Sequence, residues 1–275
     1  MDIIKSFPVK LVNKRQSKAK NPAAETVNLG IKHANGDYIA LIEADIQVGR
    51  EWLVKLFPYF KNESIGTVSG YVIVSPSGSW INRLHYLMKR RIFFAAQKRR
   101  EVASQEIYPI TGFSIFRRFV LENAGLFNET VRGTDIALDL KIRAQGYKQM
   151  CVMSAVALDI RRYTSTRLVK DCIRKGTAVY NTGGSLLYLH QQLVLRYIFL
   201  SPYYCVTLFR AGRSLVAPLF PLYALIRYFC TIIGYLKATL KKEERCPDNL
   251  RKKRKETEIR WMLISFKREI RRIIR

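Results

Sequence analysis

The stretch GDYIALIEADIQVGREWL, residues 36–53, runs an apolar segment directly into two acidic side chains. Residues 38–42 are apolar or aromatic throughout, as in a parallel strand that is covered on both faces. Glu43 and Asp45 follow this strand, and they point the same way because side chains alternate along an extended chain. Two carboxylates at the end of a buried strand are costly unless a cation offsets their charge. The stretch therefore predicts a strand whose carboxyl end carries a cation.

The position of these carboxylates suggests which cation. In open α/β sheets, ligands bind beyond the carboxyl ends of the strands. Mg²⁺ and Mn²⁺ prefer oxygen donors there, and they bind through one or two carboxylates together with the phosphate oxygens of a substrate. We therefore expect Glu43 and Asp45 to hold a metal that bridges them to a diphosphate. The alternative is a solvent-exposed loop, because an acidic pair at this spacing is common by chance.

The flanking sequence alternates between helical and extended patterns, which indicates an α/β fold. A strand is expected over residues 7–12, and a long amphipathic helix with two basic clusters, 89–91 and 98–100, over residues 79–106. The other expected elements are helices over 22–34, 51–60 (fraying near Pro58) and 134–148 (stopped by Gly146), and a strand over 67–76.

The composition changes after about residue 183. Segments 185–209 and 214–236 are long and apolar, and each is near the roughly 20 residues that cross a bilayer. Two spans, a shallow hairpin and a buried pair of core helices are all compatible with this pattern. Residues 241–275 form a basic amphipathic tail, which suits an anionic membrane surface, although a solvated tail is the alternative. Because Lys- and Arg-rich segments stay on the cytoplasmic side, we expect the chain to lie at the cytoplasmic face of the cell membrane.

The charge of the chain is strongly positive. Its 275 residues include 48 Lys and Arg against 21 Asp and Glu, a net charge of +27. Such a charge fits nucleic acid, anionic lipid or phosphorylated ligands. We expect no nucleic-acid partner, because the sequence shows no helix-turn-helix pattern, zinc spacing or ladder of basic and aromatic residues. The five scattered cysteines, without a CxxC pair, favour a reducing compartment over a disulfide framework or a zinc site.

Three ordered motifs resemble those of family 2 glycosyltransferases, which have the GT-A fold. They are NLGIKHANGDYIALIEAD (28–45), GFSIFRRFVLENAGLFNE (112–129) and GTDIALDLKIRAQGYK (133–148). In the first motif, Glu43 replaces the usual first Asp of the metal-binding pair. The resemblance covers about residues 5–180. The residues that match the family in register in the first motif are Asn28, Gly30, Ile31, Ala34, Gly36, Asp37, Tyr38, Ile39 and Asp45.

The resemblance implies inverting transfer of a sugar from a UDP- or GDP-linked donor to a lipid-linked or saccharide acceptor. Asp45 and Glu43 would hold Mg²⁺ or Mn²⁺ on the donor diphosphate, and Asn28 and Gly30 would lie on the donor side. Asp135 matches the catalytic base of the family. Asp159 stands where relatives often carry a His that contacts the metal or phosphate, so we expect it to be a third metal ligand.

The second half of the family pattern departs from its usual residues. Thr134, Ala137 and Lys141 stand where relatives have Glu, Asp and Arg. Asp139 lies one helical turn beyond Asp135 and would partly compensate, although a solvated helix residue is the favoured expectation. Arg117 and Arg118 are candidates for contacts with phosphate or acceptor, with an exposed helix pair as the favoured alternative.

The resemblance begins at the third strand region of the family, after the strands that hold the nucleotide base and ribose. It therefore implies a truncated GT-A (Rossmann-like) mixed sheet, followed by membrane-associated helices. An uncovered sheet edge with exposed apolar side chains is expected near residues 9–12 and 38–42. A non-catalytic membrane partner, or a split enzyme completed by a second chain, is the alternative. The expected units are a partial GT-A domain (1–182), hydrophobic helices (183–240) and the basic tail (241–275).

Overall fold

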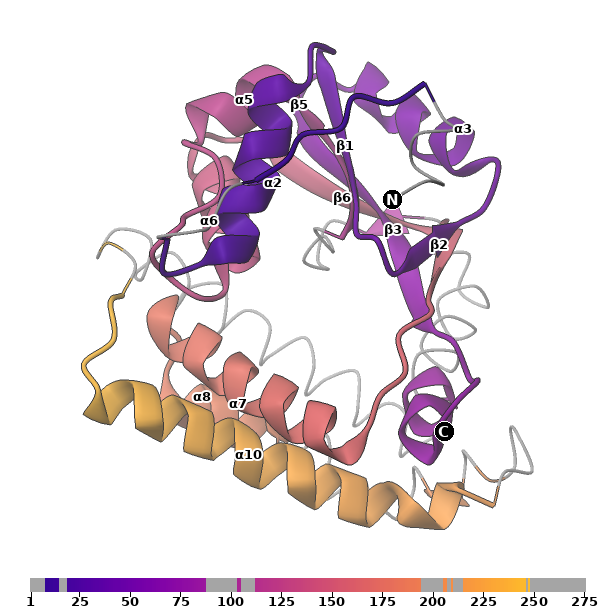
Figure 1. Ribbon diagram of the computed structural model, residues 1–275, viewed down its shortest axis with the longest axis vertical. Coiled ribbons are helices and arrows are strands. Elements are labelled where there is room, and N and C mark those ends of the chain that lie inside the picture. The colour runs from indigo at the N-terminus through magenta and orange to yellow at the C-terminus, as the bar shows by residue number, and fades with distance from the viewer. Residues whose placement is uncertain are drawn as a thin grey trace.

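The centre of the molecule is a mixed β-sheet (Figure 1). The computed structural model describes residues 8–14, 19–87, 103–104, 112–193, 205–206, 209, 215–245 and 247. Within these residues the sheet has six strands in the order β1-β5-β3-β6-β2, and β4 pairs with β6. The strands are β1 (Tyr38–Ile42), β2 (Ile46–Val48), β3 (Ile65–Val74), β4 (Ala103–Ser104), β5 (Phe113–Arg117) and β6 (Lys148–Asp159).

Two pairings fix where the strand ends meet. β3 and β6 are parallel, and Val74 pairs with Asp159 at their carboxyl ends. The short strand β2 runs antiparallel to β6, so that Ile46 pairs with the same Asp159. The turn that carries Glu43 and Asp45 is thereby held against the end of β6.

The first strand is an edge strand. Among the described residues β1 pairs only with β5, and this pairing is antiparallel. The expectation of a parallel strand covered on both faces was therefore wrong, because Ile42 is 38% exposed. The expected exposed edge is confirmed: Val9 and Leu11 are also exposed. Residues 8–14 contain no strand, so the strand predicted at 7–12 is not found over its described part.

Helices cover both faces of the sheet (Figure 1). One face packs against α2 (Pro22–His33), α5 (Arg118–Asn123) and α6 (Thr134–Ala144), and the other against α3 (Trp52–Leu56) and the 3₁₀ turn Phe57–Lys61. Strand β5 shows the alternation that this requires: Phe113 and Ile115 face α3, and Phe116 faces α2. The predicted helices near 22–34, 51–60 and 134–148 and the strand near 67–76 are confirmed.

A second layer contains α7 (Ser165–Asn181), α8 (Leu186–Leu193), the 3₁₀ turn Ala217–Leu219 and α10 (Phe220–Leu240). Figure 1 shows α7 and α10 side by side, apart from the sheet. They approach closely because both carry a glycine at the contact: a Cβ on Gly176 would collide with the backbone of Thr231, and one on Gly234 with the carbonyl of Ile173. This layer has its own core, which also includes Ile81 and Leu84.

The long helix predicted over residues 79–106 is shorter in the structure. Residues 80–87 are helical, but Ala103 and Ser104 form strand β4, so one helix cannot run to residue 106. The two basic clusters at 89–91 and 98–100 lie outside the described residues, as do most of segment 185–209 and almost all of the predicted basic tail. Among the described residues, one helical segment, Ala217–Leu240, is long and apolar enough to cross a membrane.

Candidate active site

The acidic pair sits in the turn between β1 and β2. The Glu43 amide donates to the Gly112 carbonyl at 3.0 Å, and the Glu43 carbonyl accepts from Ile46 at 3.0 Å, which closes the turn. The amide of Ile160 donates to the carbonyl of Asp45 at 3.0 Å. The end of β1 is thus tied to the residue that follows β6, so side chains from both ends gather in one place.

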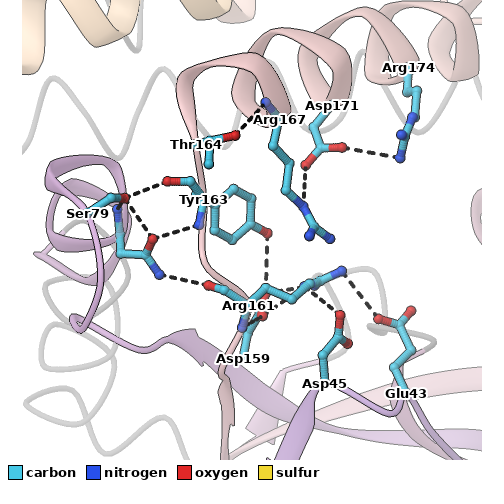
Figure 2. Close-up of polar contacts among 11 residues, drawn as sticks. Glu43, Asp45, Ser79, Asp159, Arg161, Tyr163, Thr164, Arg167, Asp171 and Arg174 are labelled. Carbon is cyan, nitrogen blue, oxygen red and sulfur yellow. Dashed lines mark hydrogen bonds and ion pairs between the residues drawn. The ribbon is translucent and has the colours of Figure 1, made fainter.

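Arg161 lies at the centre of this gathering (Figure 2). Its guanidinium Nε is 3.1 Å from Asp45 Oδ2, its Nη1 is 3.6 Å from Glu43 Oε2, and its Nη2 is 2.6 Å from Asp159 Oδ2. The cation that the sequence required at the end of β1 is therefore supplied by the chain itself. Hydrogen bonds to Asp159 are the main cause that raises the pKa of Arg161, so the guanidinium stays charged.

Both carboxylate oxygens of Asp159 accept hydrogen bonds from Arg161. Asp159 is 2% exposed. Its Oδ1 accepts from the Arg161 amide at 3.0 Å and from Arg161 Nε at 2.8 Å. Its Oδ2 accepts from Arg161 Nη2 at 2.6 Å and from the Tyr163 hydroxyl at 3.3 Å. A metal at Asp159 would have to displace some of these bonds.

The segment that carries Arg161 is itself braced (Figure 2). Asn82 is buried; it donates to the Arg161 carbonyl at 2.8 Å and accepts from the Tyr163 amide at 2.8 Å. The Ser79 hydroxyl donates to the Tyr163 carbonyl and stands 2.8 Å from Asn82 Oδ1. These contacts fix the backbone at Arg161 and Tyr163, which restricts where the Arg161 side chain can reach.

Glu43 and Asp45 remain open on one side, since their side chains are 48% and 36% exposed. Burial raises the pKa of Glu43; Arg161 opposes this, whereas the charges of Asp45, Asp159 and Asp135 add to it. Gly112 gives Glu43 its room, because a Cβ there would lie 2.7 Å from Glu43 Cδ.

The pair fits a divalent cation that takes its other ligands from elsewhere. Mg²⁺ and Mn²⁺ need only one or two carboxylates when substrate phosphates and water complete the shell. Within the described ranges, the structure contains no group of three or more His, Cys, Asp or Glu side chains that could hold a metal. A metal at Glu43 and Asp45 would therefore depend on the oxygens of a bound ligand.

Asp135 stands near the acidic pair. It lies in the first turn of α6, is exposed, and is close enough for its charge to raise the pKa of Glu43. The turn before it needs Gly133, which has a φ of 73° and packs against Ala178 of α7. The structure thus brings Asp135, Glu43 and Asp45 into one electrostatic environment.

Asp139 is not the solvated residue that the sequence led us to expect. It is 3% exposed, and Arg143 Nε lies 3.1 Å from both of its carboxylate oxygens. Burial raises the pKa of Asp139 to about 6, although Arg143 opposes the shift. The helical pattern did not reveal this burial because it depends on a tertiary contact: Gln149 of β6 donates to the Asp139 carbonyl, so this part of α6 lies against the sheet.

Other residues taken from the family pattern have structural partners. Asn28 is buried; it donates to the Phe127 carbonyl and to Glu129, and accepts from the Phe127 amide, which joins α2 to the loop after α5. Gly30 lies on the exposed side of α2. Neither joins the acidic cluster, so their donor-side role stays a prediction.

The adjacent arginines of β5 and α5 bind backbone carbonyls. Arg117 donates to Ile65 and Phe60 and to the Tyr38 hydroxyl, and Arg118 donates to Gly36 and Ala34. Both are partly buried, so the expected exposed helix pair is not observed. Their contacts hold the turn before β1 and the 3₁₀ turn against the sheet.

The sequence pattern did not predict that Arg161, Tyr163 and Asn82 belong to this site. An arginine two residues after an aspartate is a weak local signal, and nothing nearby marks it as a partner of Glu43. Only the pairing of β2 with β6 brings residues more than a hundred positions apart into contact.

Comparison with known proteins shows what the chain resembles. Residues 2–125 match the family described as Glycosyl transferase family 2. Over this stretch, just under half of the chain, the sequence is similar to that family. It is 24% identical over 127 residues to poly-beta-1,6-N-acetyl-D-glucosamine synthase of Staphylococcus aureus, in strain COL and equally in strain N315. This match covers 46% of the chain and 31% of the synthase, so the chain spans about a third of the curated relatives it matches.

A solved structure shares the fold of this chain. It is the mannosyltransferase PcManGT from Pyrobaculum calidifontis in complex with GDP-Man and Mn²⁺, with a TM-score of 0.51 and 15% identity. The match covers 88% of the present chain and 72% of the mannosyltransferase. This likeness confirms a GT-A-like mixed α/β fold.

Proposed function

We propose that the chain is a glycosyltransferase that moves a sugar from a nucleotide-sugar to an acceptor at a membrane surface. The observation that carries the proposal is the turn after β1, where Glu43 and Asp45 lie within the segment that matches family 2 glycosyl transferases. This turn is near enough to Asp135 for the charge of Asp135 to raise the pKa of Glu43. The GDP-Man and Mn²⁺ bound by the fold relative and the polymer made by the curated relatives support this class of reaction.

The acidic residues have two roles in this proposal, one for Glu43 and Asp45 together and one for Asp135. Asp45 and Glu43 would hold Mg²⁺ or Mn²⁺ at the diphosphate of a UDP- or GDP-linked sugar. Such a metal offsets the charge that develops on the leaving diphosphate. Asp135 takes the proton from the acceptor hydroxyl as the oxygen attacks the anomeric carbon, which gives inversion. An acceptor that is itself a phosphate needs no base, so the role of Asp135 reports on the acceptor.

The outer face of α10 supports a membrane-borne acceptor. Six apolar side chains recur at intervals of three or four residues and are 41–84% exposed. This spacing places them on one side of the helix. We define them as the α10 stripe: Leu222, Leu225, Phe229, Ile233, Leu236 and Leu240.

The packing of α10 favours a helix that lies in the plane of the membrane over one that spans it. Its inner face packs along α7, which carries Arg167, Lys170, Arg174 and Lys175. A spanning α10 would draw these charges into hydrocarbon, where each is costly. With the stripe turned to lipid, Lys237 and Lys241 lie within reach of anionic headgroups. We place this surface on the cytoplasmic face of the cell membrane, where a lipid-linked or saccharide acceptor would be met.

A second candidate is a split or non-catalytic partner of a glycosyltransferase. The observation in its favour is the edge of β1, which is unpaired on one side within the described residues. Such an edge can accept a strand from another chain. This candidate predicts that nucleotide binds only when the second chain is present.

Nucleotide binding by the whole chain in detergent tests the proposal. We expect UDP or GDP to raise the melting temperature in the presence of Mn²⁺, and Asp45→Asn to abolish the Mn²⁺-dependent part. Glu63→Gln is the matched control, because it removes an exposed carboxylate elsewhere on the surface. Absence of a shift with either nucleotide, with or without Mn²⁺, would overturn the proposal and favour the split candidate.

A further inference from the structure

Arg161 has contacts that the family pattern does not explain. We propose that Arg161 binds the diphosphate of the donor, and that Asp159 is the positioning residue that holds it, not a metal ligand. The inference rests on the proposed function, because it assigns a new residue to the same donor site.

The guanidinium is fixed on one side and available on the other. Nε and Nη2 donate to the two oxygens of Asp159 at 2.8 and 2.6 Å. Nη1 points towards Glu43, whose Oε2 is 3.6 Å away and which is itself half-exposed. A guanidinium has five donors in a planar fork that matches phosphate oxygens, so one edge can stay on Asp159 while the other meets a ligand.

The charge balance of the site requires such a donor. Glu43, Asp45 and Asp159 surround one guanidinium, and Asp135 adds a further negative charge nearby. A diphosphate entering this place is repelled by the carboxylates unless cations face it. A divalent metal on Glu43 and Asp45 would take over their charge and release Nη1 of Arg161 for the phosphate.

The anchor is strong enough to keep Arg161 in place. Asp159 is buried, and a buried carboxylate without its partner is costly, so the pair does not separate easily. Asn82 and Ser79 hold the backbone of residues 161 and 163. Arg161 is thus held in place before a ligand arrives, and a preorganised cation of this kind favours the binding of a phosphate.

The same position makes Arg161 a competitor of a metal. When no nucleotide is present, Arg161 and Mn²⁺ need the same oxygens of Glu43 and Asp45. Removing the guanidinium should therefore strengthen binding of Mn²⁺ alone and weaken binding of nucleoside diphosphate without metal. A residue with only a structural role would weaken both when it is lost.

The experiment measures both affinities in the whole chain, by calorimetry for UDP or GDP in EDTA and by electron paramagnetic resonance for free Mn²⁺. In Arg161→Gln we expect nucleotide binding to weaken by about tenfold or more, and Mn²⁺ binding to tighten by roughly threefold to tenfold. Arg161→Lys keeps a positive charge beside Asp159, so this variant should fold. We expect its nucleotide binding to weaken about half as much as in Arg161→Gln, because Lys cannot form the planar fork of a guanidinium. Arg162→Gln removes the same charge from the exposed neighbour and should change neither affinity by more than about twofold.

Three outcomes decide the inference. Weaker nucleotide and tighter Mn²⁺ in Arg161→Gln support it. Unchanged nucleotide binding in that variant, or a parallel loss of both affinities in Arg161→Lys and Arg161→Gln, overturns it and leaves the proposed function standing. If the unmodified chain binds neither nucleotide under any condition, the proposed function fails and this inference fails with it.

Discussion

The end of β1 and the outer face of α10 differ in how their side chains are partnered: the carboxylates of the first contact an arginine, whereas the apolar side chains of the second are exposed. At the end of β1, three carboxylates meet one arginine, and a network from Ser79, Asn82 and Tyr163 holds that arginine in place. On α10, six large apolar side chains are left exposed. The first region offsets part of its negative charge with its own arginine, whereas the second leaves apolar surface that water does not favour. The contrast separates a place suited to chemistry from a surface suited to docking on lipid.

Loss of Asp135 tests the chemical region and should have the largest effect. We expect Asp135→Asn to lower kcat for transfer to a hydroxyl acceptor by about 10²- to 10⁴-fold, because the proton of the acceptor has no base. Affinity for nucleotide should change little, since Asp135 is exposed and does not contact Arg161. Steady-state kinetics and nucleotide titration on one preparation separate the two effects. Full activity of the variant with a hydroxyl acceptor would exclude Asp135 as the base.

The glycines between α7 and α10 test whether the helical layer is a packed unit. Gly234→Leu forces a side chain into the backbone of Ile173, so we expect a loss of about 3 kcal/mol or more in the free energy of unfolding. Gly30→Ala is the matched control, because a Cβ at that exposed helical position meets nothing within 4 Å. It should stabilise the chain by about 0.5–1 kcal/mol through helix propensity. Thermal melts of both variants measure the difference; equal stabilities would show that α7 and α10 do not pack as described.

The α10 stripe tests the docking region. Phe229 and Ile233 are 57% and 52% exposed, so the double change Phe229→Asp with Ile233→Asp should leave the melting temperature in detergent nearly unchanged. Binding to vesicles of phosphatidylcholine and phosphatidylglycerol should fall by about tenfold or more, because burial of each side chain is worth roughly 1.5–3 kcal/mol. Co-sedimentation measures this binding. Unchanged co-sedimentation would show that the stripe does not meet lipid.

The pH dependence of stability that comes from Asp139 is the smallest expected effect. The folded pKa of Asp139, about 6, lies above the unfolded value, so the folded state holds the proton more tightly between about pH 4 and 6. The stabilisation from this proton is complete below the unfolded pKa and is lost as the pH rises through 6. Relative to Asp139→Asn, the wild-type chain should therefore lose on the order of 1–3 kcal/mol of stability between pH 4 and 7. A constant difference in unfolding free energy across this range would contradict the assignment.

The helices and strands of the sheet domain follow from local signals that the sequence contains. Asn21 caps α2 by accepting from the Ala24 amide, with Pro22 at the first helical position. Gly146, with a φ of 90°, lies just beyond the end of α6. Such signals act between residues only a few positions apart, which is why they are legible in the chain. The predicted amphipathic helix at 79–106 has such a signal at its start, where Ser79 accepts from the Asn82 amide. Its predicted end had no such marker, and the strand β4 falls inside that range.

The sequence by itself determined that an apolar strand ends in two carboxylates, that these need a cation, and that the chain resembles a glycosyltransferase family. Only the tertiary structure decided that the nearest cation is Arg161, that Asp159 faces this arginine, and that Asp139 is buried against Arg143. It also decided that β1 runs antiparallel to its neighbour β5. The reason is that an ion pair depends on distance in space, and the register between β2 and β6 sets the distance from Glu43 to Arg161. Local periodicity carries no information about that register.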